Sequence, residues 1–135
     1  MPHDPDSLPR RPWKHPALSQ LIVCAGGTCG GPGGARVPRR DLLEAWKGAY
    51  LWRACHLSFS DCLGPCELAG NACLLSAAGS VWLGGLEERH YSLLAGWAAG
   101  CKQERRLLPL PDALRALELE RFADPRELEF ERKKS

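Results

Sequence analysis

Residues 25–34 contain six glycines and one proline, and this composition excludes regular secondary structure over the segment. The apolar run Leu21-Ile22-Val23 precedes it and predicts a short buried strand that ends at Cys24. Apolar positions at 42, 43, 45 and 46 predict an amphipathic helix after it, ending at Gly48. The chain therefore passes from strand to helix through a loop whose backbone N–H groups can approach a bound group closely.

The middle of the chain carries the remaining periodic patterns. Alternating side chains predict a strand over residues 51–59, placed centrally in a sheet because neither of its faces is purely polar. A hairpin is expected from strands at 72–76 and 80–84. Apolar residues at helical spacing predict a second helix over residues 87–101, with acidic residues at its start. This order of elements predicts an α/β sandwich.

Prolines and a change of composition divide the chain into three parts. Residues 1–19 contain five prolines and are expected to form an irregular arm. Residues 20–101 form the predicted domain, and residues 102–135 a C-terminal helical extension with a charged tail. Within the extension, a helix is predicted over residues 112–122, and its leucines require it to pack back onto the domain or onto a second copy.

Composition excludes several classes of partner. The chain has 135 residues, of which 44% are hydrophobic and 25% charged, the balance of a soluble globular protein. Eighteen Lys+Arg against sixteen Asp+Glu leave a net charge of +2, which argues against a nucleic-acid binder. No apolar run approaches the roughly 20 residues of a membrane span, and the first residues do not form a secretory signal. We therefore expect a cytoplasmic protein without a membrane partner.

Seven cysteines are an odd number, and in a reducing compartment they do not suggest a disulfide framework. Four of them lie in or beside glycine-containing loops, at C-x4-C and C-x3-C spacing: Cys24, Cys29, Cys62 and Cys66. Both pairs follow strands that could be neighbours in one sheet, so these four thiols are interpreted as metal ligands gathered at one end. The other three lie among apolar neighbours and are expected to pack in the core: Cys55, Cys73 and Cys101.

Two kinds of centre suit four cysteines. A [2Fe–2S] cluster needs four thiolates, and its sulfurs accept hydrogen bonds from backbone N–H groups, which glycines make accessible. The alternative is a structural zinc site, although such sites usually use C-x2-C knuckles and neither pair has that spacing. No C-x-x-C motif opens a helix, so thioredoxin-type thiol exchange is not expected.

The motifs carry a family resemblance. Cys24 and Cys29 at C-x4-C spacing, then a helix, a strand and residues 61–67 (DCLGPCE), resemble the thioredoxin-like [2Fe–2S] ferredoxins. That family includes stand-alone bacterial ferredoxin domains and the small cluster subunit of respiratory complex I. The resemblance covers about residues 20–101 and includes residues 81–86 (VWLGGL), which are similar to the strand before the family's final helix.

This resemblance implies a thioredoxin-like sandwich with a small mixed sheet and a [2Fe–2S] cluster bound by Cys24, Cys29, Cys62 and Cys66. It further implies a one-electron carrier, not an enzyme, with an unidentified redox partner protein, and it suggests a homodimer. Two alternatives stay open: a zinc-stabilised binding module, and a cluster-carrying subunit of a larger redox or cobalamin-synthesis enzyme. Arg36, Arg39 and Arg40 follow the first loop, where they either offset cluster charge, dock an acidic redox partner or form a solvated helix start.

Overall fold

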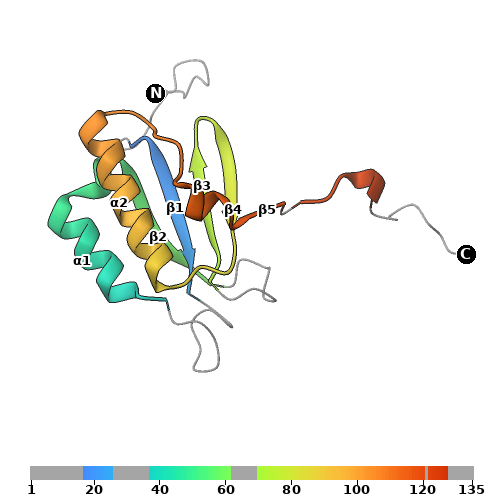
Figure 1. Ribbon diagram of the computed structural model, residues 1–135, viewed down its shortest axis with the longest axis horizontal. Helices are drawn as coiled ribbons and strands as arrows, with labels where there is room; N and C mark the ends of the chain where they lie inside the picture. Colours follow the sequence, from blue (N-terminus) through green and yellow to red (C-terminus); the bar gives the residue numbers. More distant parts are fainter. Residues whose placement is uncertain (1–16, 26–36, 62–69, 121, 128–135) are drawn as a thin grey trace, which may run out of the picture.

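A computed structural model describes residues 17–25, 37–61, 70–120 and 122–127 of the chain (Figure 1). These residues form a five-stranded sheet of order β2-β1-β3-β4-β5, in which β1 and β2 are parallel and every other pair is antiparallel. The strands are β1 (Ser19–Cys24), β2 (Cys55–Ser60), β3 (Ala72–Ser76), β4 (Gly79–Leu83) and β5 (Glu118–Leu119). The predicted α/β class with a mixed sheet is therefore confirmed.

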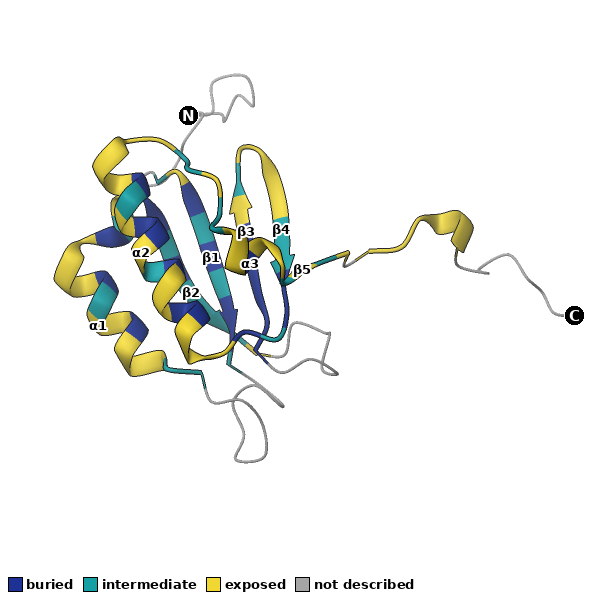
Figure 2. Ribbon diagram, in the orientation of Figure 1, coloured by how far each residue is buried: buried dark blue, intermediate teal, exposed yellow. Residues whose placement is uncertain are grey.

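The helices cover one face of this sheet, as Figure 1 shows. They are α1 (Arg39–Ala49), α2 (Glu88–Glu104) and the short α3 (Asp112–Arg115). Leu21 pairs with Leu57 on one side and Leu74 on the other, so these core side chains point to the same face. Buried residues of the sheet and the helices meet there (Figure 2). No helix in the described ranges is long and apolar enough to span a membrane.

Local patterns correctly predicted the hairpin and the second long helix. The hairpin of β3 and β4 pairs Ala72 with Leu83 and Ser76 with Gly79, as expected. Helix α2 starts at Glu88 behind a capping box, in which the Glu87 backbone N–H donates to Nδ1 of His90 at 2.8 Å. His90 is buried and therefore has a structural role at the start of the helix.

The segment between α1 and β2 differs from the prediction. Helix α1 ends at Ala49 instead of Gly48, because Tyr50 adopts the left-handed conformation that terminates it. The chain then needs a tight turn, so the 3₁₀-helix η3 (Leu51–Arg53) replaces the first part of the expected strand. Leu51 is buried in this turn and reaches the core without belonging to the sheet.

The predicted central position of the second strand is also wrong, because β2 is an edge strand in the described sheet. The absence of a purely polar face suggested a strand between two neighbours. Instead, Trp46 of α1 donates a hydrogen bond from Nε1 to the Cys55 carbonyl oxygen at 2.7 Å. A helix side chain therefore satisfies a backbone acceptor on this strand and covers part of it.

The prediction of a single helix over residues 112–122 is wrong as well. Helix α3 ends at Arg115, and the chain then forms β5, which pairs Leu119 with Trp82 and Glu118 with Leu83. The edge of β4 offers hydrogen bonds that a short surface helix could not replace. Leu114 is nevertheless completely buried in the core, so the extension packs back onto the domain as predicted.

The face of the sheet without helices carries a row of apolar side chains. Strand register places Ile22 beside Cys73, Cys73 beside Trp82, and Trp82 beside Leu119. The Trp82 ring contacts Phe122 edge to face, with 5.7 Å between the ring centroids, and Phe122 is exposed. In this row Cys73 is buried, and Ile22, Trp82 and Leu119 are partly buried, so the apolar strand surface is only partly exposed. The homodimer stays a prediction.

Candidate metal centre

The parallel strands β1 and β2 end side by side, with Cys24 paired to Ser60. The Ala25 N–H donates to the Ser60 carbonyl oxygen at 2.8 Å, which extends the pairing by one residue. The Cys24 thiol donates to the Asp61 carbonyl oxygen, with 3.6 Å between sulfur and oxygen. The two strands that precede the cysteine pairs are thus neighbours, as the sequence suggested.

Strand β3 begins at the same edge of the sheet. The Asn71 carbonyl oxygen accepts the Cys24 N–H at 2.9 Å, and Asn71 is buried. Gly70 has a φ of +80°, and its carbonyl oxygen accepts the Leu86 N–H at 2.9 Å. A Cβ at Gly70 would collide with the Leu86 backbone, lying 2.8 Å from its nitrogen. Only glycine suits this position.

Gly70 and Asn71 fix the point where the chain re-enters the sheet after residues 62–69. Neither was among the predicted site residues. In the sequence, these two residues appear only as a glycine and a polar residue immediately before an apolar strand. This pattern also occurs at ordinary turns, so it does not point to a site. Their role depends on contacts with Cys24 and Leu86, which are distant in sequence.

Of the four predicted ligands, Cys24 is among the described residues and the other three are not. Cys24 is completely buried at the end of β1. Cys29, Cys62 and Cys66 lie outside the described residues. Within the described ranges, no group of three or more His, Cys, Asp or Glu side chains converges on a common point. The four-cysteine ligand set therefore stays a prediction.

The remaining cysteines have the environment of packed thiols. Cys55, Cys73 and Cys101 are all buried, as expected. Desolvation by burial raises the pKa of Cys55 from 9.0 to about 11. Burial also raises the pKa values of Cys73 and Cys101. Thiols with raised pKa values are protonated at neutral pH and are therefore poor nucleophiles and poor metal ligands.

The raised pKa of Cys55 should make the folded protein less stable as the pH rises through the alkaline range. Between pH 9 and 11 the unfolded chain releases this proton while the folded chain keeps it, so the free energy of unfolding falls as pH rises. We expect the titration of Cys55 to lower the free energy of unfolding by about 2 kcal/mol between pH 8.5 and 10.5. Urea unfolding of the wild type and of Cys55→Ala measures it, and equal pH dependence in both proteins would contradict it.

A hollow of about 330 Å³ opens beside the edge where β1 and β2 end. Its described lining residues come from the ends of both strands and from the start of α1: Ala25, Arg39, Phe59, Ser60 and Asp61. Ala25 directly follows Cys24, and Asp61 directly precedes Cys62. The hollow therefore adjoins the chain positions of two predicted ligands.

Comparisons with known proteins give a likeness in structure alone. No family model matches the chain, and no curated protein matches it in sequence. A structure of a thioredoxin-like [2Fe–2S] ferredoxin from Aquifex aeolicus aligns with a TM-score of 0.48 at 14% identity, over 82% of this chain and 97% of that chain. The wild-type crystal structure of that ferredoxin aligns with a TM-score of 0.43 at 16% identity, over 70% and 99%. Identities this low do not transfer residue roles.

Proposed function

We propose that the protein is an electron carrier in which Cys24, Cys29, Cys62 and Cys66 hold a [2Fe–2S] cluster. The observation that supports this most is the junction of two cysteine-bearing segments at one sheet edge. The Cys24 sulfur lies 3.6 Å from the carbonyl oxygen of Asp61, the residue before Cys62. The described residues that lead into the two cysteine-bearing segments therefore meet at this edge.

The donor set fits this cofactor. Two cysteines from each of two loops supply four thiolates, the number that a [2Fe–2S] cluster requires. When bound, the cluster supplies reversible one-electron transfer. The chain contributes a buried thiol at Cys24, held in place by the hydrogen bond from its N–H to Asn71. A carrier of this kind needs no substrate-transforming side chain.

Metal and sulfide analysis of anaerobically purified protein tests the proposal. We expect about two iron atoms and two acid-labile sulfides per chain, with a visible absorption that bleaches on reduction. Zinc without sulfide would contradict the carrier and support the zinc-stabilised binding module. Copurification of a large partner with intact iron and sulfide would assign the same cluster to a subunit of a redox enzyme.

A further inference from the structure

The ends of the two long helices carry a surplus of positive charge. Helices α1 and α2 pack side by side and end at the same end of the molecule, where η3 packs against both of them (Figure 1). Residues 46–53 and 101–106 cover these helix ends and contain five basic residues and one acidic residue. All five basic residues are exposed: Lys47, Arg53, Lys102, Arg105 and Arg106. We call these five residues, together with the exposed Tyr50, the basic surface.

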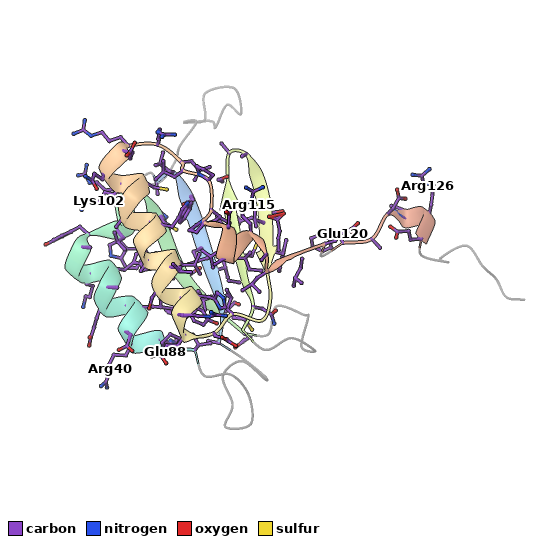
Figure 3. The ribbon with its side chains drawn as sticks, in the orientation of Figure 1. Arg40, Glu88, Lys102, Arg115, Glu120 and Arg126 are labelled. Atoms are coloured by element: carbon purple, nitrogen blue, oxygen red, sulfur yellow. The ribbon has the colours of Figure 1, made fainter. Side chains whose placement is uncertain are left out.

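The starts of the same helices do not show this surplus. Residues 37–41 and 87–89 contain three basic and three acidic residues, so the charges balance there. Figure 3 places Lys102 at the opposite end of the helix layer from Arg40 and Glu88. The positive charge is therefore concentrated at one end of the helix layer, although the chain as a whole has a net charge of only +2.

Two residues of the basic surface occupy positions where glycine is usual. Tyr50 and Arg105 follow the last residues of α1 and α2 in the left-handed conformation, with φ of +52° and +58°. A side chain costs free energy at such a φ, and glycine would avoid that cost. The helix dipole favours cations in the last turn, which accounts for Lys47 and Lys102 but not for an aromatic ring. Helix termination therefore does not explain these two side chains.

Lys102 fixes the position of the exposed ring. Its Nζ donates a hydrogen bond to the Ala49 carbonyl oxygen at 2.6 Å, which joins the end of α2 to the end of α1. The same Nζ lies 5.8 Å from the centroid of the Tyr50 ring, and Tyr50 is 73% exposed. An aromatic ring and an ammonium group are thus presented together to the solvent.

We propose that the basic surface binds an acidic segment of a partner protein. Its cations complement carboxylates, and the Tyr50 ring supplies the aromatic contact that protein interfaces favour. Glu104 forms an ion pair with Arg106, with 3.6 Å between Oε1 and Nη2, so the surface carries charges of both signs. A protein segment can match such a mixed pattern, whereas nucleic acids and anionic lipids present negative charge alone.

The basic surface lies away from the candidate metal centre. Strand β2 begins at Cys55, next to η3, and ends at Ser60 beside that centre, a length of about 17 Å. Binding of an acidic partner does not require a bound cluster, so the inference stands apart from the proposed function. Failure of the binding experiment would leave the electron carrier untouched, and absence of iron would leave the binding surface untouched.

Binding of a fluorescein-labelled oligo-glutamate peptide to the full chain, followed by fluorescence anisotropy, tests the inference. We expect saturable binding by the wild type at low salt and weaker binding at high salt. Arg105→Gly should weaken binding about threefold, the effect of one exposed ion pair, and Tyr50→Gly should weaken it as well. Both variants should resist urea at least as well as the wild type, because glycine relieves the left-handed residue. Residues that served only the fold would instead lose stability and keep the binding.

Arg89→Gln is the matched control, since Arg89 is exposed on the same helix but lies at its start. It lowers the net charge equally and should bind the peptide as the wild type does. No peptide binding by the wild type, unchanged binding by both glycine variants, or equal weakening by Arg89→Gln would overturn the inference. Tighter binding of single-stranded DNA or phosphatidylserine vesicles than of the peptide, lost in the same variants, would also overturn it and assign the surface to that class of partner.

Discussion

Serine in place of Cys24, Cys29, Cys62 or Cys66 is expected to remove most of the bound iron and the visible absorption. Each substitution removes one of the two thiolates that each iron receives from the protein, and a serine hydroxyl is a much weaker ligand for iron than a thiolate. Iron and sulfide contents of the four variants, purified anaerobically, measure the effect.

Cys73→Ser and Cys101→Ser are the matched controls, because these buried thiols lie outside the predicted ligand set. They should keep iron, sulfide and absorption, and lose only packing free energy. Cys101 also accepts the Leu108 N–H at 3.3 Å, a contact that a serine hydroxyl can partly replace. Loss of iron from Cys101→Ser together with full iron in Cys29→Ser would show that the ligand assignment is wrong.

Ending the chain after Arg106 is expected to destabilise the protein strongly. This truncation removes Leu114, which is completely buried, and β5, which pairs with β4. It also removes Leu108, whose carbonyl oxygen accepts a hydrogen bond from Nε1 of Trp97 at 2.9 Å. Leu114→Ala alone should cost about 2–5 kcal/mol, and the truncation should cost more. Urea or thermal unfolding measures both.

A chain that ends after Asp124 is the control, since it keeps α3, β5 and the Phe122 contact with Trp82. It should unfold close to wild type. The truncated proteins should retain iron, because β5 lies three strand spacings from β1, which is about 14 Å. Wild-type stability after truncation at Arg106 would contradict the packing role of the extension. Loss of iron from a truncated protein that still folds would contradict the expectation that the C-terminal extension lies away from the metal centre.

Local patterns in the sequence were sufficient for the elements that depend on near neighbours. The apolar run before Cys24, the hairpin of β3 and β4, and the periodicity of α2 all predicted structure correctly. These elements form because side chains two to four residues apart share a face, and that spacing is visible in a single sequence. The cysteine spacing likewise selected the candidate ligands from the residue types alone.

Only the tertiary structure decided the features that depend on distant partners. Residues 118–119 form a strand because the edge of β4 is available to them. Cys55 belongs to an edge strand, which Trp46 of α1 partly covers. Gly70 must be glycine because the Leu86 backbone lies against it, and the Arg39 guanidinium lies over the Phe59 ring. In each case the deciding contact joins residues far apart along the chain, and no local periodicity records such a contact.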